Sequence, residues 1–385
     1  MKKMKLFLKM GVIALFFLHC YTVSGRNIYV SKKGNDRNKG TKEKPYKTVA
    51  KATSNAVAGD IVYIQAGVYT KGLTVQNSGE ENKYIEFRTY EGDEHQVVFE
   101  GKGISIISKN YIKINGFRIQ NADNGVKVGG PAHHIIIENN YTYNTFSSGI
   151  IAWGVPWQKD PMEYNNIQHL YIHNNKVEKA CNGGWNECIT LANGIRSFEV
   201  TNNEVFNGGD PINGGEGIDI KEGCQDGIVA YNYTHHLTRR GIYIDAGGVL
   251  GFAPPLMKNI KVFGNISRFN THQKHQCHGM AVMTEGDGDV QDIEIYNNVF
   301  SDNNMDGLMI YKHPVGSGKL KNITIHQNLI FNNKRHGILI NDRTSENIKV
   351  AHNIINQNEL KEIALVSGEA EVNDNLLTSV SEKNQ

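Results

Sequence analysis

A short motif recurs through most of this chain, and it restricts the possible folds more than any other feature. Each copy contains a stretch of alternating apolar residues, then an asparagine, then a second short apolar stretch. The asparagines are Asn140, Asn175, Asn203, Asn232, Asn265, Asn298, Asn328 and Asn353, at intervals of 25 to 35 residues. Short strands that repeat at this interval, without a helical period, are typical of a solenoid in which each repeat forms one coil.

A third recurring piece follows the asparagine in each repeat, so every coil is predicted to contain three short strands. Examples are EGIDIK from Glu216 and RGIYID from Arg240. Parallel strands of successive coils would stack about 4.8 Å apart. The asparagines would then form a column in which each side chain hydrogen-bonds to backbone and to the next asparagine. The predicted fold class is therefore all-β, a parallel β-helix.

The repeat resembles that of the pectate-lyase-like superfamily of secreted carbohydrate-active enzymes. The N-terminal segment NIYVSKKGNDRNKGTKEKPYKTVAKA also resembles the opening of many secreted β-helix lyases and hydrolases. This resemblance covers nearly all of the chain beyond residue 25. It implies a right-handed β-helix and a short N-terminal capping helix within YKTVAKATSNAVA. A cap is needed because the first coil would otherwise expose unpaired backbone groups and apolar core.

The first 25 residues are predicted to be an export signal. Four lysines (Lys2, Lys3, Lys5 and Lys9) precede an apolar run from Met10 to Leu18 that is too short to span a membrane. We expect residues 26–385 to form a single β-helix domain, with residues 26–100 as the N-terminal cap and first coils, and no transmembrane span. The protein would be periplasmic or secreted. Lipidation of Cys20, with attachment to the outer surface, is the alternative.

The charge balance argues against nucleic acid as a partner. Without the four lysines of the signal, the formal net charge falls from +2 to −2, whereas binding to a phosphate backbone needs a basic surface. Export permits disulfides, so the remaining cysteines are expected either to pair or to be buried thiols; they are Cys181, Cys188, Cys224 and Cys277. We expect a monomer whose substrate is an acidic polysaccharide or oligosaccharide.

Ionisable residues gather in the middle coils, on the third strand of each repeat. When these strands are aligned on their glycine, neighbouring outward columns contain Glu187, Glu216, Asp219, Lys221, Arg240, Tyr243, Asp245 and His278. Toward the C-terminus the same columns become apolar, at Leu339, Ala364 and Val366. A merely solvated face would stay polar along its length, so the change indicates a functional groove. The alternative is that opposite charges simply stabilise the sheet.

These side chains suit a lyase that cleaves a uronic-acid-containing glycan by β-elimination. Such an enzyme neutralises the uronate carboxylate, removes the proton from the adjacent carbon and protonates the leaving oxygen. Lys221 or His278 is the predicted base, Arg240 neutralises or positions the carboxylate, and Tyr243 donates the proton. A base role for Lys221 requires a lowered pKa, which crowded cations and exclusion of water would give.

Calcium is the alternative neutralising group, because it prefers several hard oxygen ligands. The predicted calcium ligands are Glu187, Glu216, Asp219 and Asp245. This layout is similar to that of polysaccharide lyase family 9, which implies calcium together with a lysine base. That family places acids at the start of adjacent coils, as Glu216 does here. The chain departs from the family pattern at TRRGIYID, where Arg239 and Arg240 stand in place of acids and only Asp245 remains.

Two other function classes stay open. Glycoside hydrolysis needs two carboxylates about 5 Å apart for retention or about 6.5–9.5 Å apart for inversion, which Glu187 with Glu216, or Asp219 with Asp245, would supply. The third class is a non-catalytic carbohydrate-binding surface protein. In each case aromatic rings would stack on sugars, unless they only cover the core. The predicted substrate-binding residues are Trp153, Trp157, Trp185, Tyr311 and Lys312.

Overall fold

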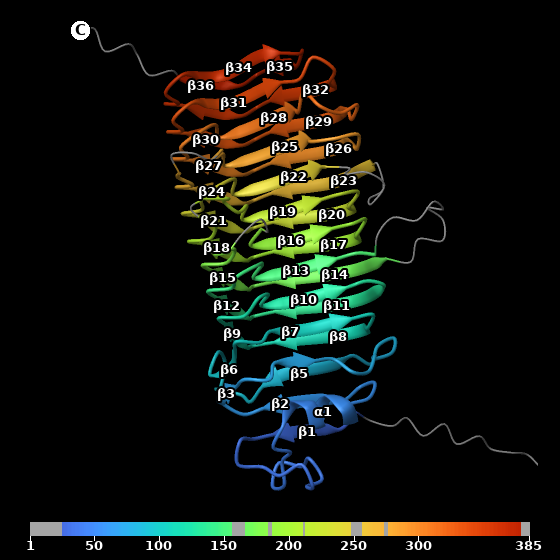
Figure 1. Ribbon diagram of the computed structural model, residues 1–385. Coiled ribbons are helices and arrows are strands. Elements are labelled where there is room, and N and C mark those ends of the chain that lie inside the picture. Colours follow the sequence, from blue (N-terminus) through green and yellow to red (C-terminus); the bar gives the residue numbers. More distant parts are fainter. Residues whose placement is uncertain are drawn as a thin grey trace, which may run out of the picture.

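Three parallel sheets run along the molecule and enclose one continuous core, as expected for a parallel β-helix (Figure 1). The computed structural model describes residues 25–155, 166–183, 187–210, 212–247, 256–272 and 276–378. Each coil contributes one strand to each sheet in turn, and every strand pair between coils is parallel, such as Lys221 opposite Asp245. The three strands predicted for each repeat are therefore confirmed.

The first sheet is formed by the alternating apolar stretch that precedes each asparagine. Its strands, in spatial order, are β1 (Asn27–Val30), β2 (Ile61–Ile64), β5 (Ile85–Thr89), β8 (Asn110–Asn115), β11 (Ala132–Glu138), β14 (Ile167–His173), β17 (Arg196–Thr201), β20 (Gln225–Ala230), β23 (Leu256–Phe263), β26 (Asp289–Tyr296), β29 (Leu320–His326), β32 (Glu346–Ala351) and β35 (Glu371–Asn373). Alternate residues point into the core, as Phe198 and Val200 do in β17.

The second sheet is formed by the short apolar stretch that follows each asparagine. Its strands are β3 (Gly67–Tyr69), β6 (Val97–Glu100), β9 (Arg118–Gln120), β12 (Tyr141–Tyr143), β15 (Lys176–Glu178), β18 (Glu204–Phe206), β21 (Tyr233–His235), β24 (Ile266–Arg268), β27 (Val299–Ser301), β30 (Leu329–Phe331), β33 (Ile354–Asn356) and β36 (Leu376–Thr378). In most of its three-residue strands the middle residue faces inward, such as Val205 in β18.

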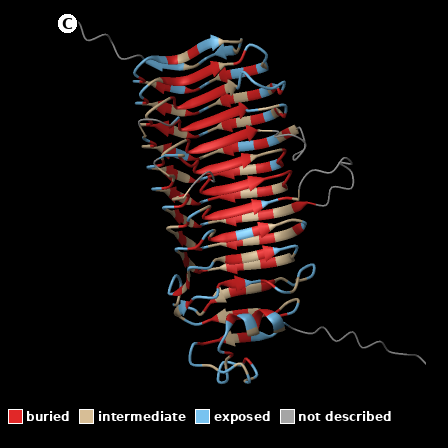
Figure 2. Cartoon of the chain, viewed as in Figure 1, coloured by how far each residue is buried: buried red, intermediate tan, exposed pale blue. Residues whose placement is uncertain are grey.

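The third sheet carries the predicted site. Its strands are β4 (Leu73–Thr74), β7 (Ile104–Ile107), β10 (Val126–Gly129), β13 (Ile150–Trp153), β16 (Ile189–Ala192), β19 (Ile218–Lys221), β22 (Ile242–Ala246), β25 (Met280–Thr284), β28 (Leu308–Lys312), β31 (His336–Asn341) and β34 (Lys361–Ser367). In its middle coils both faces are buried, so β16, β22 and β25 are buried along their whole length (Figure 2).

The asparagine column lies at the corner between the first and second sheets. Asn232 is typical, because its backbone N–H and its Nδ2 both donate to Oδ1 of Asn265, at 2.9 and 3.0 Å. Its Nδ2 also donates to the carbonyl oxygen of Val200 at 2.8 Å. The predicted column is confirmed and extends to Asn375. A second column at the corner before the third sheet was missed in the sequence; it contains Asn270, Asn303, Asn333 and Asn358.

The N-terminal helix is confirmed and is shorter than the segment predicted to contain it. Helix α1 (Val49–Asn55) begins after Thr48, whose side chain accepts a hydrogen bond from the Lys51 amide. It buries Val49, Ala52 and Thr53 at the blue end of the stack, beside β1 and β2 (Figure 1). Residues 1–24 lie outside the described residues, so the export signal and the lipidation of Cys20 stay predictions. No helix in the described part is long and apolar enough to cross a membrane.

The four cysteines beyond residue 25 are buried free thiols. Of the two alternatives expected from the sequence, the structure therefore shows the unpaired one. Because the coils already form a continuous apolar core, these thiols behave as small core side chains.

Candidate active site

The third sheet brings the predicted residues together on four consecutive strands, β16, β19, β22 and β25. Asp219 lies opposite Tyr243, and Lys221 lies opposite Asp245. Glu187 and Glu216 stand two residues before the first two strands, and Arg240 and His278 stand two residues before the other two. Because parallel strands in register place equivalent side chains in rows, the sequence columns become spatial columns, as predicted.

The exposure of these columns differs from the expectation of an open groove. Asp219 and His278 are each 1% exposed, and Glu187 is 6% exposed. The charged side chains form ion pairs between adjacent coils, such as Lys221 with Glu187 and Arg240 with Glu216. These pairs shield one another from solvent. Beyond them, an apolar row formed by Tyr243, Ala281, Met283, Met309, Leu339 and Ala364 continues along the same face. The predicted change from polar to apolar is thus confirmed, but the polar part is a buried cluster.

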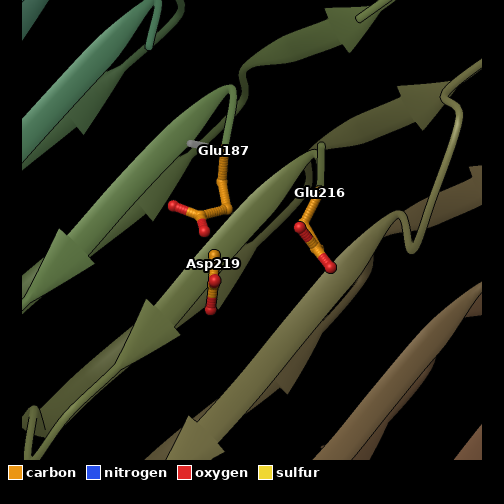
Figure 3. A group of neighbouring side chains, drawn as sticks. All are labelled: Glu187, Glu216 and Asp219. Atoms are coloured by element: carbon orange, nitrogen blue, oxygen red, sulfur yellow. The ribbon is translucent and has the colours of Figure 1, made fainter. Parts of the chain in front are cut away.

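Three carboxylates form the centre of this cluster (Figure 3). One oxygen from each of Glu187, Glu216 and Asp219 lies within 4.8 Å of the other two. Thr190 Oγ1 donates to Glu187 Oε2 at 3.1 Å and helps to fix that carboxylate. Burial and the nearby acids Glu187 and Asp245 raise the pKa of Asp219 well above its usual value, although Lys221 opposes them. Burial therefore works against the ionised form of Asp219, and the contact with Lys221 is what favours that form.

Lys221 is the cation at the centre of these acids. Its Nζ lies 2.8 Å from Glu187 Oε1 and 2.9 Å from Asp219 Oδ2. Burial alone would lower the pKa of Lys221, but Asp219, Glu187 and Asp245 outweigh it and hold the pKa well above its usual value. The lowered pKa expected from crowded cations is therefore wrong, because the neighbours are acids. An ammonium that retains its proton is a poor base, so this environment argues against the predicted base role of Lys221.

A pair of arginines neutralises the third carboxylate. Arg240 and Arg239 each place NH1 against Glu216 Oε1, at 2.9 and 3.2 Å. Burial would raise the pKa of Glu216, but Arg240, Arg239 and Lys221 outweigh it and keep the pKa below its usual value. Because two guanidinium groups share one carboxylate, the pair retains an excess positive charge. Arg239 carries that charge toward solvent, since 30% of its side chain is exposed.

Tyr243 and His278 both lie near Arg240. The guanidinium of Arg240 lies over the Tyr243 ring, 4.4 Å from its centroid. The Tyr243 hydroxyl donates to Glu285 Oε1. Burial, Asp245 and Glu285 raise the pKa of Tyr243 well above 10, although Arg240 opposes them. In the next coil, the carbonyl oxygen of His278 accepts from the Gly241 amide at 3.0 Å, which places His278 beside Arg240.

His278 forms a buried pair with Asp306. Its Nδ1 lies 3.2 Å from Asp306 Oδ2, with the two side chains 1% and 0% exposed. Burial lowers the pKa of His278, the contact with Asp306 raises it, and Arg240 lowers it again, so that the pKa lies below its usual value. Among the described residues, His278 Nε2 has no hydrogen-bond partner. The imidazole is therefore neutral at physiological pH. The Asp306 amide also donates to Nδ1 at 3.3 Å, so Nε2 can accept a proton only in the tautomer whose proton lies on Nδ1, toward Asp306 Oδ2.

Two pockets flank the cluster on the same sheet. One, of about 490 Å³, contains Lys127 and Trp153, and the other, of about 480 Å³, contains Tyr311 and Lys312. Trp153 is 40% exposed, and Tyr311 packs against the apolar row. The predicted residues Trp157 and Trp185 lie outside the described residues. Each pocket thus pairs an aromatic ring with a lysine.

The predicted calcium ligands do not fit calcium in this arrangement. Oxygens of Glu187 and Asp219 contact the Lys221 ammonium, and the Glu216 oxygen contacts two guanidinium groups. Asp245 is not among the carboxylates that lie within 4.8 Å of one another in the described part of the chain. Calcium needs six to eight oxygen ligands, whereas one oxygen of each of Glu187, Asp219 and Glu216 already contacts a protein cation.

Four site residues were not identified as such from the sequence: Arg239, Gln276, Glu285 and Asp306. Asp306 stands in the same sequence column as His278, one coil further along the chain. The alignment of the repeats therefore indicated that these two side chains would be neighbours. Arg239 was recognised only as a departure from the family pattern. Gln276, which accepts from Arg240 NH2, and Glu285 lie outside the aligned columns and gave no signal.

Comparison with known proteins agrees with the fold. Residues 28–186 match the family described as Pel9A-like, right handed beta helix region, and residues 275–377 match the family described as right handed beta helix region. The uncharacterized protein YwoF of Bacillus subtilis is 33% identical over 215 residues, which are 51% of this chain and 44% of that protein. Pectate lyase PEL9 of Emericella nidulans is 33% identical over 82 residues, 21% of this chain and 20% of that protein. The chain thus aligns with less than half the length of these relatives.

Solved structures of similar shape include both lyases and hydrolases. The GH136 lacto-N-biosidase of Eubacterium ramulus superposes with a TM-score of 0.62 at 12% identity, over 92% of this chain and 68% of that one. An alginate lyase of Paenibacillus sp. str. FPU-7 superposes with a TM-score of 0.51 at 15% identity, over 92% and 99%. At these identities the likeness concerns the fold alone. The chain is therefore a right-handed parallel β-helix, and its resemblance to the pectate-lyase-like superfamily is confirmed.

Proposed function

We propose that this protein is a polysaccharide lyase that cleaves a uronic-acid-containing glycan by β-elimination at the site around Arg240. One observation carries the proposal: the Arg240 guanidinium lies over the ring of a protonated tyrosine and is near enough to His278 to lower the pKa of that neutral histidine. Arg240 lies over the Tyr243 ring at 4.4 Å, and His278 adjoins it in the next coil. Neutralisation, proton removal and proton donation each need one such group.

The reaction assigns one role to each side chain. Arg239 and Arg240, which share only Glu216, bind the uronate carboxylate and make the adjacent carbon more acidic. His278 Nε2 takes the proton from that carbon, the electron pair forms the carbon–carbon double bond, and the bond to the glycosidic oxygen breaks. The Tyr243 hydroxyl protonates the departing oxygen. Since Tyr243 and His278 are 3% and 1% exposed, the sugar has to displace part of the side chains that cover them.

The flanking pockets support an extended acidic substrate. Trp153 and Tyr311 offer aromatic faces to sugar rings, while Lys127 and Lys312 offer positive charge. From β10 to β31 the third sheet spans seven inter-coil steps, roughly 34 Å at about 4.8 Å each. That length accommodates several sugar residues on both sides of the cleaved bond.

The proposal is tested by incubating the purified protein with a panel of acidic polysaccharides. A lyase produces an unsaturated uronate, so ultraviolet absorbance should rise in proportion to new reducing ends. His278→Gln should abolish both signals. New reducing ends without the absorbance rise would contradict β-elimination.

A specific observation favours glycoside hydrolysis as the second candidate. Carboxylate oxygens of Glu216 and Asp219 lie within 4.8 Å, close to the separation of about 5 Å in retaining glycosidases. The pKa of Asp219 is raised and that of Glu216 is lowered, as an acid and a nucleophile require. Under this alternative Asp219→Asn would abolish the release of reducing ends, while His278→Gln would spare it.

The pH dependence of turnover should report the protonation of His278. Asp306, Arg240 and Arg335 are the charged groups that act on it, and its pKa lies below the ordinary value of 6.5. The acid limb of kcat/KM should therefore have its midpoint below 6.5. Because the pKa of His278 is lower in the folded than in the unfolded protein, the neutral imidazole also affects stability. Its contribution to the free energy of unfolding is fully present above pH 6.5 and is lost as the pH falls through the folded-state pKa. An acid limb above 6.5 would exclude His278 as the base.

Lys312→Ala tests the C-terminal pocket. Its Nζ lies at an exposed position, 3.4 Å from Thr344 Oγ1, and we place it on a distal sugar carboxylate. Loss of a contact that is the same in ground and transition states raises KM and leaves kcat unchanged. We expect KM to rise about 1.5-fold to fivefold, as for a weak solvent-exposed charge pair. A fall in kcat with unchanged KM would contradict a binding role.

A further inference from the structure

The cluster contains an ammonium group at the place where a bound cation would meet its carboxylates. Lys221 Nζ contacts Glu187 Oε1 at 2.8 Å and Asp219 Oδ2 at 2.9 Å. Only 16% of the lysine side chain is exposed, against 8% and 1% for its two partners. The two acids come from neighbouring coils, β16 and β19, and Figure 3 shows them on the same side of the sheet. Lys221 therefore bridges two coils, as a metal ion would.

We propose that the Lys221 ammonium takes the place of a divalent cation, so that the native site excludes calcium and Lys221→Met opens a calcium site. Calcium–oxygen distances are about 2.3–2.6 Å, so calcium would have to share both oxygens with the ammonium. Two cations that close repel each other, and burial strengthens the repulsion. The consequence for catalysis, activity without calcium, rests on the proposed function. The statement about cation binding does not.

Unused oxygen atoms around Lys221 support the second half of this inference. Asp219 Oδ1 and Asp245 Oδ1 are buried and have no hydrogen-bond partner among the described residues. Asp245 lies opposite Lys221 in the next strand. Methionine retains most of the length of lysine but no charge. Its introduction would leave Glu187 and Asp219 without their shared cation, and hard carboxylate oxygens are the ligands that calcium prefers.

The test measures calcium binding by titration calorimetry and calcium-dependent change in melting temperature, for wild type and Lys221→Met. Wild type should give no binding heat and the same melting temperature in calcium as in chelator. Lys221→Met should melt lower than wild type in chelator, recover part of the loss in calcium, and bind calcium at least about tenfold more tightly than wild type. Lys261→Met is the matched control, because Lys261 forms an exposed pair with Glu294 at 3.7 Å; it should show no calcium effect.

Two results would overturn the inference. One is calcium binding by wild type that is lost in Glu187→Gln. The other is a folded Lys221→Met that calcium neither binds nor stabilises. If Lys221→Met does not fold, Lys221→Met combined with Glu222→Gln removes one nearby acid that is not a proposed ligand, and the same calcium titration applies to it.

Activity measured alongside separates this inference from the proposed function. Lyase activity that survives chelation supports both. If wild type binds calcium and loses its lyase activity on chelation, the proposed function stands and the inference about cation binding is wrong. If wild type neither binds calcium nor has lyase activity, the inference about cation binding stands and the proposed function is wrong.

Discussion

Arg240→Ala should abolish most turnover and also destabilise the protein. The side chain is 3% exposed and contacts Glu216, Gln276 and the Tyr243 ring. Removing one partner of a buried ion pair costs about 3–5 kcal/mol of unfolding free energy. Loss of a charge that stabilises the transition state lowers kcat about 10²–10³-fold. The measurements are steady-state turnover on the identified substrate and the midpoint of thermal unfolding.

A second variant separates the two effects. Arg240→Met combined with Glu216→Gln removes both members of the pair, which is often nearly neutral for stability. We expect the double variant to melt above Arg240→Ala and still lack turnover. Arg268→Ala is the matched control, because Arg268 lies over Phe269 on the second sheet, far from the cluster in the fold; its turnover should equal that of wild type. Wild-type turnover in Arg240→Ala would sink the site assignment.

Asn265→Ala should be the most destabilising change outside the site. It removes the acceptor for the backbone N–H and Nδ2 of Asn232, and the donor to the carbonyls of Val229 and Phe263. Each buried polar group left unpaired costs about 1–3 kcal/mol, so we expect a total of at least about 3 kcal/mol. Because coils contact only their neighbours, amide hydrogen exchange should accelerate mainly in the adjoining coils.

The matched control is Asn373→Ala, an exposed asparagine whose Nδ2 donates to Glu371 Oε1 at 2.8 Å. A surface change of this kind costs within about 0.5 kcal/mol. Equal unfolding midpoints for the two variants would show that the asparagine column contributes little to stability.

The sequence predicted the backbone of this protein better than the state of its side chains. The asparagine column and the third-strand glycines specify strand order and register, because a period of one coil leaves only one way to stack. The same register correctly placed Asp219 opposite Tyr243 and Lys221 opposite Asp245. The second column, from Asn270, was missed because it begins only in the later coils.

The side-chain environment could not be predicted in the same way. Whether Lys221 meets cations or acids depends on which rotamers reach across two coils, and the sequence columns do not contain that information. The expected open groove was wrong for the same reason, since the charges cover one another. Glu285 and Gln276 reach the cluster from strand ends, where no repeat fixes the position.

The asparagine column has a direction, and this sets how the chain can change in length. Each side-chain amide donates to the oxygen of the next asparagine toward the C-terminus, as in Asn203 to Asn232 to Asn265. A single residue inserted between two of these asparagines would form a bulge at the surface or break one hydrogen bond of the column. Insertion of a complete coil would instead lengthen the column by one equal step. The length of such a molecule therefore changes in steps of whole coils, and duplication of one coil is the change that preserves the contacts between neighbouring coils.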